Sequence, residues 1–546
     1  MFRENTAHLQ GNLFNNLSVM DSRLAQKLQN SWAALFYEHV FCQIDENLFA
    51  PLYSNDNGRP NFPVNIFMGL DLIKEIRDYT DEVLLDEYAF NYQISYALGL
   101  RTLGERYFAP RTLYEFRARL YQYSIQYPEK ADLIYALFQR LTDHFIEVAG
   151  LNKDEVRMDS TQIMSNIRLA GRLSLAYDVL VSGIKALPEH LVKESLTIFL
   201  KSDYKTRFLY QVKGKDMLSR IQSLIDHCAE VLQQVETHNE LKDIAEVQLL
   251  ERFVKEQATF SEYENKWIVK GAKEISSKSL QSAYDADATY RNKNGKKHVG
   301  YALNLSETCA DANPVQIVNH YELAANTTSD IELLERALPT LSENGITDIY
   351  TDGGYYSSDI AETAQTKGIT VHYTDMTGRK ESNQKLPYSD FEIENKQKVI
   401  SCPTGQKPYR TAYDEKEKIL SAHFKRDVCD QCPQKESCRV KFQKKDTVLR
   451  VSQKVLNVEE SRLKIKDLEL RKEATSKRAA IEGTNSALKR AHGADKLSVR
   501  GINKCRLIMG AKIIAHNFRQ LARYLSGYDR RKRKTRKLIQ GIPIAI

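Results

Sequence analysis

Hydrophobic residues recur at helical spacing through the first 150 positions of the chain. Over 64–99 apolar side chains fall three and four residues apart, which is the spacing of one helix face. A second such pattern begins at Pro110 and runs to about residue 123, because proline is favoured at the start of a helix. An earlier helix is predicted over 22–39, and the stretch SNDNGRPNFP that follows it indicates a loop. Residues 61–150 are therefore predicted to be all-helical.

Beyond this block the pattern changes to a period of two. Alternating apolar and polar residues over 155–163 predict a strand with Asp159 near its centre. The same alternation in DADATYR, HVGYALNLSET and PVQIVNHYELA predicts two or three antiparallel strands. Asn294 and Gly295 form the dipeptide preferred in two-residue hairpin turns, so these strands are expected to be joined there.

Strands and helices then alternate. A helix over 329–344 leads into a strand over 349–355, a helix over 358–367 and a short strand over 369–373. Asp352 lies in the first of these strands, directly before two glycines. This order of elements predicts a mixed α/β sheet with helices packed on it.

Two long helical patterns flank or interrupt this sheet. Residues 167–270 are helical and highly charged, which indicates a helical hairpin inserted after the first strand. Helical character returns over 458–490 and again over 503–524, after a polar, cysteine-bearing stretch.

These patterns divide the chain into six segments. They are an N-terminal helical arm (1–60), a helical domain (61–150), an α/β core (151–375) with a helical insertion at about 167–270, a Cys-rich insertion (376–457), C-terminal helices that complete the core (458–525) and a basic tail (526–546). A chain of 546 residues exceeds the size at which one hydrophobic core stops growing, so several domains are expected.

Composition excludes a membrane-spanning or disordered chain. Hydrophobic residues make up 42% and charged residues 27%, close to the averages of globular proteins. The apolar stretch 507–515 is interrupted by Lys512 and is shorter than the roughly 20 residues a membrane span needs. The N-terminus lacks the pattern of a signal peptide, so a reducing cytoplasmic compartment is expected.

Basic residues are concentrated rather than merely numerous. The formal net charge of +8 is a weak indication of a polyanionic partner, since many enzymes carry a similar charge. Residues 529–537, DRRKRKTRK, hold seven basic residues in nine. A solvated tail and a tail that contacts DNA phosphates are both compatible with this run.

Three carboxylates are placed for metal chemistry. Asp159 lies on the first predicted strand, Asp352 at the end of a later strand, and Glu482 on the helix expected to cover the same edge. Small residues after Asp352 would let a ligand approach the backbone closely. Hard cations such as Mg²⁺ or Mn²⁺ take oxygen ligands, and two such ions can support an in-line phosphoryl displacement. The alternative for any single acid is a helix cap or a surface salt bridge.

The strings RMDSTQI, YTDGGYYS and KRAAIEGTNSALKRAHG resemble the three motif regions of bacterial insertion-sequence DDE transposases. Arg478, Glu482 and Lys489 match the Arg-x3-Glu-x6-Lys part of the third motif, although Thr475 stands where the family has a Tyr. The resemblance spans roughly 61–523. It implies an RNase H-like core, the catalytic triad Asp159, Asp352 and Glu482, and two Mg²⁺ or Mn²⁺ ions.

The same resemblance implies a reaction and partners. The expected reaction is hydrolysis at the ends of the element, followed by transfer of the freed 3′-OH into target DNA. Residues 61–150 are similar to the family's domain that binds terminal inverted repeats. The expected partner is double-stranded DNA, both terminal repeats and target, bound by a homodimer that brings two ends together. A bacterial, nucleoid-associated protein is expected, with no membrane partner.

Several cations are candidates for DNA contact. Arg478, Lys489 and Arg490 lie within the third motif, on what is predicted to be a single helix, so that several share one face with Glu482. A salt-bridged surface helix is the alternative.

Further cations and acids lie outside the third motif. Lys296 and Lys297 flank the predicted hairpin turn, and Arg111 lies on the last helix before residue 150, where an ordinary surface Arg is the alternative. Asp285, Asp287 and Asp375 are second-tier carboxylates, and of these Asp287 is the candidate to help position metal or DNA.

Four of the eight cysteines are clustered. Cys402, Cys429, Cys432 and Cys438 could supply the four thiolates of a structural Zn²⁺ site, although the last spacing is longer than usual. Unmetallated thiols are the alternative, and a disulfide is disfavoured in a reducing compartment. The zinc-bearing segment would lie between the strand of Asp352 and the helix of Glu482.

Two other functions remain compatible with the sequence. A catalytically inactive DNA-binding protein, such as a domesticated transposase, would keep the fold and the basic surfaces. A metal-dependent nuclease would keep the acids but would not join strands.

Overall fold

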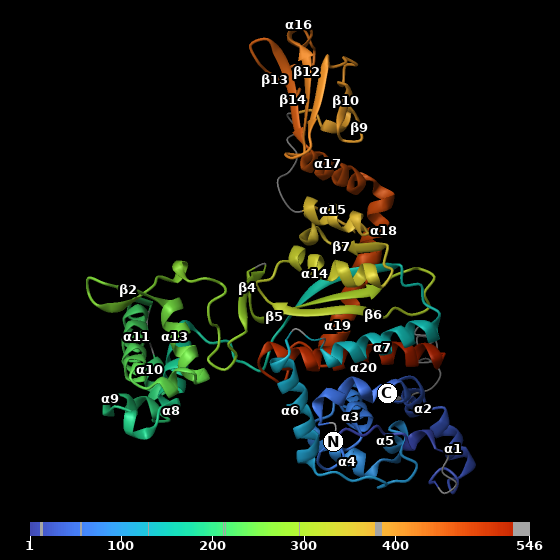
Figure 1. Cartoon of the computed structure of the whole chain (residues 1–546), viewed down its shortest axis with the longest axis vertical. Coiled ribbons are helices and arrows are strands. Elements are labelled where there is room, and N and C mark those ends of the chain that lie inside the picture. The colour runs from blue at the N-terminus through green and yellow to red at the C-terminus, as the bar shows by residue number, and fades with distance from the viewer. Residues whose placement is uncertain are drawn as a thin grey trace, which may run out of the picture.

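The computed structural model describes residues 1–10, 15–54, 57–128, 130, 132–210, 212, 214–293, 295–376 and 385–527. The basic run 529–537 and Asn294 of the predicted turn lie outside these residues. Figure 1 shows a central α/β body with helices below it, a helical insertion at one side and a β-rich domain at the far end. Among the described helices, none has the length and apolar content that crossing a membrane requires.

The first 150 residues are helical, as predicted. The α-helices are α1 (Ser22–Gln29), α2 (Trp32–His39), α3 (Val64–Arg77), α4 (Asp81–Phe90), α5 (Tyr92–Ala97), α6 (Pro110–Gln126) and α7 (Leu133–Ala149), with 3-10 turns η1 (Ala7–Leu9), η2 (Phe41–Gln43) and η3 (Glu46–Leu52). The single helix predicted over 22–39 is wrong, because the hydroxyl of Ser31 accepts a hydrogen bond from the Ala33 N–H and starts a new helix there.

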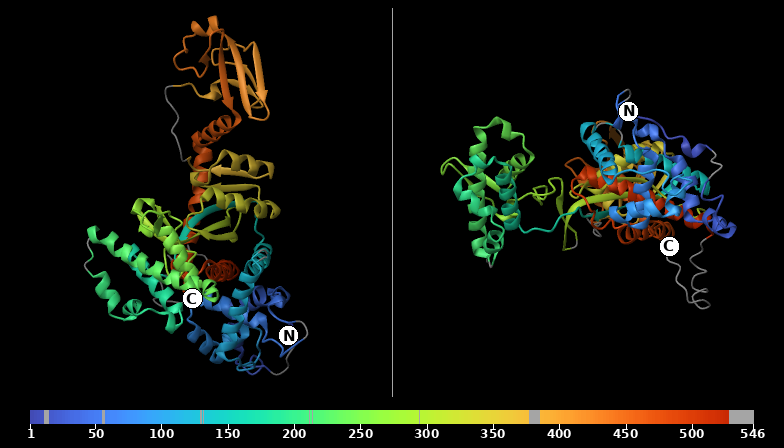
Figure 2. Two further views of the ribbon diagram at one scale, coloured as in Figure 1. Left: turned by 60° about the vertical axis from the view of Figure 1, so that its left-hand side comes forward. Right: turned by 90° about the horizontal axis from the view of Figure 1, so that it is seen from below.

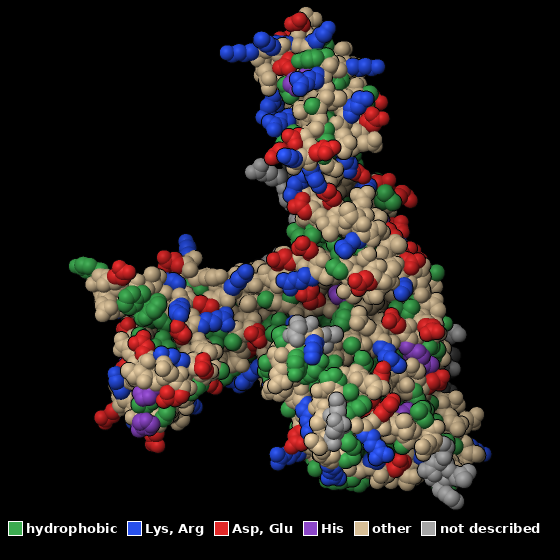
Figure 3. All heavy atoms as spheres, viewed as in Figure 1, with side chains coloured by type: hydrophobic (Ala, Val, Ile, Leu, Met, Phe, Trp, Pro, Cys, Tyr) green, Lys and Arg blue, Asp and Glu red, His purple; other side chains and the backbone are tan. Residues whose placement is uncertain are grey.

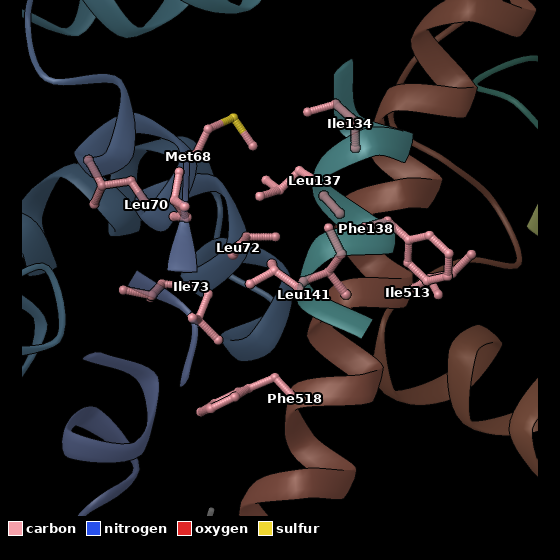
Figure 4. Close-up of a cluster of buried hydrophobic side chains, with 14 of the residues drawn as sticks. Met68, Leu70, Leu72, Ile73, Ile134, Leu137, Phe138, Leu141, Ile513 and Phe518 are labelled. Carbon is pink, nitrogen blue, oxygen red and sulfur yellow. The ribbon is translucent and has the colours of Figure 1, made fainter. Parts of the chain in front are cut away.

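The helices α3, α7 and α20 (Ile502–Leu525) meet in one apolar core. Figure 4 shows Leu72 and Ile73 of α3 facing Leu141 of α7 and Phe518 of α20. Burying each such side chain fully stabilises the fold by roughly 1.5–3 kcal/mol. The same hydrophobic cluster continues into three strands of the central sheet, so the N-terminal helices and the sheet share a core.

The central sheet has six strands. They are β1 (Glu155–Ile163), β4 (Thr289–Lys293), β5 (Lys296–Thr308), β6 (Val318–Ala325), β7 (Asp348–Thr351) and β8 (Thr370–Tyr373). The order is β4-β5-β1-β7-β8, with β6 also paired to β5. β1 runs antiparallel to β5 and parallel to β7, so the sheet is mixed, as predicted.

Helices cover both faces of this sheet. On one face α14 (Asp330–Glu343) and α15 (Ser358–Thr366) pack against Val156 and Met158 of β1. On the other face lie α18 (Leu468–Ala479) and α19 (Ile481–Ala491), together with α7 and α20. Because successive side chains of a strand point to opposite faces, the odd-numbered residues of β1 face α18 and α19.

The insertion after β1 has its own core and stands apart from the sheet (Figure 2). Its helices are α8 (Arg172–Ala186), α9 (Glu194–Thr197), α10 (Tyr204–Leu209), α11 (Gly214–Glu236), α12 (Asn239–Lys242) and α13 (Ala245–Gln257), with 3-10 turns η4 (Glu189–Leu191), η5 (Ile198–Leu200) and η6 (Ala272–Glu274). The prediction of helices alone is wrong at its end, where β2 (Ala258–Ser261) pairs with β3 (Lys266–Val269).

The segment that contains the clustered cysteines forms a β-rich domain. It comprises β9 (Glu392–Glu394), β10 (Lys398–Ser401), β11 (Arg410–Asp414), β12 (Ile419–Lys425), β13 (Lys441–Phe442) and β14 (Asp446–Ser452), with the helix α16 (Arg426–Asp430) and the 3-10 turn η8 (Tyr388–Asp390). Its apolar core is separate from the others. Figure 3 shows Lys and Arg side chains projecting from its outer end.

The chain returns from the β-rich domain to the sheet through three helices, not one. The continuous helix predicted over 458–490 is wrong: α17 (Gln453–Lys466), α18 and α19 replace it. Asp467 has an extended backbone, and its carboxylate accepts hydrogen bonds from the N–H groups of Glu469 and Leu470, which starts α18. The second break is at Ala480, which keeps helical dihedral angles, so α18 and α19 follow each other closely.

Candidate functional site

Two neighbouring strands and one helix bring the three predicted acids to one edge of the sheet. β1 and β7 run parallel, with Arg157 of β1 level with Tyr350 of β7. Asp159 and Asp352 each lie two residues further on, so they are level with one another. Glu482 lies in the first turn of α19, which contacts β1.

The guanidinium of Arg478 links the three acids. Its Nη2 lies 3.5 Å from Asp159 Oδ2 and 3.8 Å from Asp352 Oδ2, while Nη1 lies 3.2 Å from Glu482 Oε1. The four side chains come from α18, β1, the end of β7 and α19. The fold therefore gathers Asp159, Asp352 and Glu482 around one cation, Arg478, although 323 positions separate the first acid from the last.

Asp159 is the most buried of the three acids. Its side chain is 12% exposed, against 33% for Asp352 and 66% for Glu482. Burial is the main cause that raises the pKa of Asp159 to about 6; the charge of Arg478 opposes this rise and the charge of Asp352 adds to it. The Ser160 N–H donates to Asp159 Oδ1 (2.9 Å), and Asn485 Nδ2 donates to Oδ2 (3.5 Å).

The first of the two glycines after Asp352 is needed for a backbone approach. A Cβ on Gly353 would lie 2.7 Å from the backbone oxygen of Asp375, closer than real Cβ contacts. The Gly353 N–H donates to the Asp375 carboxylate (2.7 Å), and the Gly354 N–H donates to Asp352 Oδ1 (2.9 Å). The glycines were predicted to give access to a ligand; in the structure Gly353 admits the backbone of Asp375.

A fourth carboxylate, Asp330, borders the site and was missed by the sequence analysis. It is the first residue of α14 and accepts a hydrogen bond from Ser160 Oγ (2.6 Å). Arg291 of β4 lies 3.7 Å from its other oxygen. The start of α14 was predictable from its capping pattern, but the closeness of Asp330 to Ser160 depends on how the helix packs on the sheet.

The cations of α18 and α19 divide into two groups. Arg478 contacts the acids, whereas Lys489 Nζ lies 3.6 Å from Asp495, and Arg490 is exposed. The buried face of α19 consists of Ile481, Thr484, Asn485 and Leu488. Because this face packs on β1 and the Arg478–Glu482 pair points to the other acids, α19 is not a simple salt-bridged surface helix.

A basic cluster lies on the β4–β5 hairpin. Arg291 pairs across the strands with His298, and Lys293 pairs with Lys296. The charges of Lys489, Lys293, Lys296 and Arg291 add to burial in lowering the pKa of His298. Lys297 is the neighbour of Lys296 on the strand and therefore points to the opposite face. The two predicted hairpin lysines do not act on one surface.

Other predicted residues lie away from the acids. Arg111 is exposed on α6 and pairs with Glu115 of the next turn (2.8 Å). Asp285 accepts hydrogen bonds from Ser165, Tyr301 and the Gly501 N–H.

Asp287 also serves the start of α20. Its carboxylate accepts a hydrogen bond from the Ile502 N–H (3.0 Å). Asp285 and Asp287 thus accept hydrogen bonds from N–H groups at the beginning of this helix, which accounts for acidic residues at both positions.

The four clustered cysteines line one small cavity in the β-rich domain, and all four are free thiols. The cavity has a volume of about 30 Å³, and Phe424 and Val440 complete its wall. Thr447 Oγ1 donates to Cys429 Sγ (3.0 Å). Burial raises the pKa of Cys429, and the neighbouring cysteines add to this effect.

Metal-ligand side chains are not arranged as a closed cluster. Across the described residues, no three or more His, Cys, Asp or Glu side chains are grouped so that they could hold a metal ion. The three acids are held by Arg478 instead, and the four cysteines surround a cavity without converging on a point.

Comparison with known proteins identifies one part of the chain. Residues 401–522 match the family model described as the transposase DDE domain. The matched segment begins in the β-rich domain and includes Arg478, Glu482 and Lys489, whereas Asp159 and Asp352 lie before it. No curated protein and no solved structure matches the chain.

Proposed function

We propose that this chain, a DDE transposase, cuts the ends of an insertion element and joins the freed 3′-OH to target DNA. The proposal starts from the transposase DDE domain at residues 401–522. The observation that carries this proposal is the meeting of Asp159, Asp352 and Glu482 around Arg478. Acids from a central strand, a neighbouring strand end and a covering helix place oxygen ligands at one edge of the sheet.

The proposal includes an RNase H-like core. Its support is the strand arrangement: β5 runs antiparallel between β6 and β1, and β7 and β8 continue parallel to β1. In this assignment residues 61–150 bind the DNA ends, 376–457 form an insertion, and 458–525 complete the core. We also infer a bacterial insertion sequence as the source, for which matched inverted repeats beside the coding region are the test.

Divalent metal ions are the cofactors this function implies, and the donor chemistry of the three acids fits two Mg²⁺ or Mn²⁺ ions. Asp159, Asp352 and Glu482 would hold them. When bound, such ions activate the attacking oxygen and stabilise the leaving oxygen. The Ser160 N–H and Asn485 orient the Asp159 carboxylate, and Arg478 offsets the charge of the acids.

The DNA partner is assigned to basic surfaces beside the acids. Four cations are close enough to His298 for their charges to lower its pKa. They are Arg291, Lys293 and Lys296 of the hairpin and Lys489 of α19. Phosphate contacts by such residues position DNA without reading its sequence. Two ends must be brought together for strand transfer, which supports a homodimer in the DNA complex.

The decisive experiment supplies pre-cut DNA from the flanks of the coding region together with Mg²⁺ and a target plasmid. Joined product is expected. Nicking without joining would instead favour a nuclease, and binding without either reaction would favour an inactive, domesticated protein.

Substitution of the acids tests the site within the same assay. Asp159→Asn, Asp352→Asn and Glu482→Gln should each abolish cutting and joining while retardation of the flanking DNA in gels persists. Arg207→Gln, at an exposed arginine of α10 that pairs with Asp203 (2.7 Å), serves as the control and should keep both reactions. Full activity in any acid variant would remove that residue from the site.

A structural Zn²⁺ in the β-rich domain is a separate proposal. Its support is that Cys402, Cys429, Cys432 and Cys438 line one cavity and that thiolates are preferred zinc ligands. About one equivalent of zinc is expected in protein purified without added metal, and a chelator should lower the melting temperature. Cys429→Ser should lose the metal, whereas Cys42→Ser should keep it. Zinc-free protein that is indifferent to the chelator would contradict the proposal.

A further inference from the structure

A buried polar group lies beneath the helix that carries Glu482. Arg157 of β1 donates through Nε to Glu307 Oε2 of β5 (2.7 Å), and Thr484 of α19 donates through Oγ1 to Glu307 Oε1 (2.7 Å). The three side chains are nearly inaccessible to solvent: Glu307 is 1% exposed, Thr484 6% and Arg157 8%. We call Arg157, Glu307 and Thr484 the buried clamp.

The buried clamp is one part of a row of contacts along β1. Glu155, Arg157 and Asp159 lie on the same face of the strand because they are two residues apart. Glu155 forms an ion pair with Lys477, and Arg157 Nη1 donates to the Lys477 carbonyl (3.4 Å). Asp159 contacts Arg478. Each of these residues of β1 thus contacts the last turn of α18, directly before α19.

Two residues of the buried clamp are close in sequence to two of the three acids. Thr484 is two residues after Glu482, and Arg157 is two residues before Asp159. Both ends of the clamp meet on the same Glu307 carboxylate, so the backbone that carries Glu482 is tied to the strand that carries Asp159. Glu482 itself is exposed and touches only Arg478 among the groups described above, so the clamp is a fixed connection beneath it.

We propose that Arg157, Glu307 and Thr484 are positioning residues, which set the distance between the Glu482 and Asp159 carboxylates for metal binding. This inference rests on the proposed function. Buried partners that orient metal ligands typically change metal affinity or activity by about 10- to 100-fold when they are removed. A threonine hydroxyl that bonds a buried carboxylate is suited to this, because the bond fixes the helix without adding charge to the site.

Thr484→Val is the sharpest test, because valine keeps the shape of the side chain and replaces the hydroxyl by a methyl group that cannot donate a hydrogen bond. The full chain is mixed with DNA from the flanks of the coding region, and free Mn²⁺ is titrated by electron paramagnetic resonance. Cutting is measured over the same Mn²⁺ concentrations. Thr484→Val should weaken Mn²⁺ binding about tenfold and shift half-maximal cutting equally, with DNA affinity unchanged. Thr484→Ser should restore both values to within about twofold of the unchanged protein.

A matched control separates positioning from loss of stability. Thr142 of α7 is also buried, and its hydroxyl accepts a hydrogen bond from Asn517 (3.4 Å), but it lies in the core away from the acids. Thr142→Val should lower the melting temperature and leave the Mn²⁺ dependence unchanged. Glu307→Gln is a second variant, expected to match Thr484→Val in its Mn²⁺ shift if it folds.

The outcomes are distinct. If the unchanged protein binds Mn²⁺ and cuts DNA but Thr484→Val does so with the same Mn²⁺ dependence, the positioning role is wrong while the proposed function stands. If Thr484→Val and Thr142→Val shift equally, the effect is one of stability and the inference fails. If the unchanged protein neither binds Mn²⁺ nor cuts, the proposed function fails and the inference falls with it.

Discussion

At the scale of single residues, Arg478 has the most unusual surroundings. Its guanidinium lies within 4 Å of an oxygen atom of each of three carboxylates, and its side chain is only 22% exposed. Without this cation, the repulsion between the negative charges of Asp159 and Asp352 would be less well offset. Arg478 therefore supplies positive charge at the place where divalent cations are proposed to bind.

This placement predicts competition between Arg478 and metal ions. Arg478→Gln should tighten Mn²⁺ binding by the DNA-free protein by about tenfold, because a like charge near the site is removed. Cutting of DNA should nevertheless fall, since the same residue is a proposed phosphate contact. Free Mn²⁺ is again counted by paramagnetic resonance. Arg490→Gln, at an exposed cation nearby in sequence, should leave Mn²⁺ binding unchanged, and weaker binding in Arg478→Gln would contradict the prediction.

At the scale of elements, the connection after β7 determines where Asp352 points. Asp352 begins the 3-10 turn η7 (Gly353–Tyr355), and its carboxylate accepts a hydrogen bond from within that turn. Gly353 lies against the Asp375 backbone, which follows β8. Two strand ends are therefore locked together by a contact that only a residue without a Cβ can make.

Gly353→Ala should disturb this connection. The added Cβ would meet backbone rather than a flexible side chain, so the loop must move, at a cost of roughly 1–3 kcal/mol. We expect a lower melting temperature together with loss of cutting. Gly171→Ala is the control, because a Cβ there meets nothing within 4 Å. Equal melting temperatures for the two variants would show that the Asp375 contact is not important for stability.

At the scale of the whole molecule, buried histidines line the junction between the N-terminal helices and the rest of the fold. Burial lowers the pKa of His320 to about 4, of His492 to about 4 and of His516 to about 3. His320 Nδ1 lies 2.7 Å from the hydroxyl of Tyr135 on α7, and His492 Nδ1 lies 3.1 Å from the Glu75 carbonyl on α3. These rings are neutral in the folded protein at neutral pH.

Acid should therefore weaken this junction. Below pH 6.5 the unfolded chain binds protons that the folded chain does not, so stability is complete above pH 6.5 and falls as the pH drops toward 4. At pH 5 the loss is about 2 kcal/mol for each histidine. Unfolding can be followed at each pH by the fluorescence of Trp32 in a Trp267→Phe background. Trp32 reports on this region because it packs against Arg77 of α3.

The histidine variants provide the control for this acid response. His516→Asn should make unfolding less sensitive to pH between 6.5 and 4.5, even if its stability at pH 7.5 is lower. An unchanged slope in His516→Asn would show that this ring does not contribute. His190→Asn, at an exposed histidine of the insertion, should leave the slope unchanged.

Local signals explain which elements were predicted well. The strand Glu155–Ile163 was predicted with its observed bounds, because polar and apolar residues alternate over its first five positions. The helix predicted over 329–344 differs by one residue at each end from the observed Asp330–Glu343, whose N-cap is Ser329. The single helix over 458–490 failed because helical periodicity does not reveal that Asp467 caps a new helix. The β2–β3 strands were missed because their hairpin is short and lies within a helical context.

The sequence by itself determined the order of the strands and helices of the central sheet, its mixed character and the motifs that contain Asp159, Asp352 and Glu482, because periodicity and residue type are local properties. Only the tertiary structure decided which of these residues meet. The parallel register of β1 and β7 makes the two aspartates level, and the packing of α18 and α19 brings Arg478 among the acids. The nearness of Asp330 and the buried clamp depends on contacts between residues more than 140 positions apart, for which no local pattern exists.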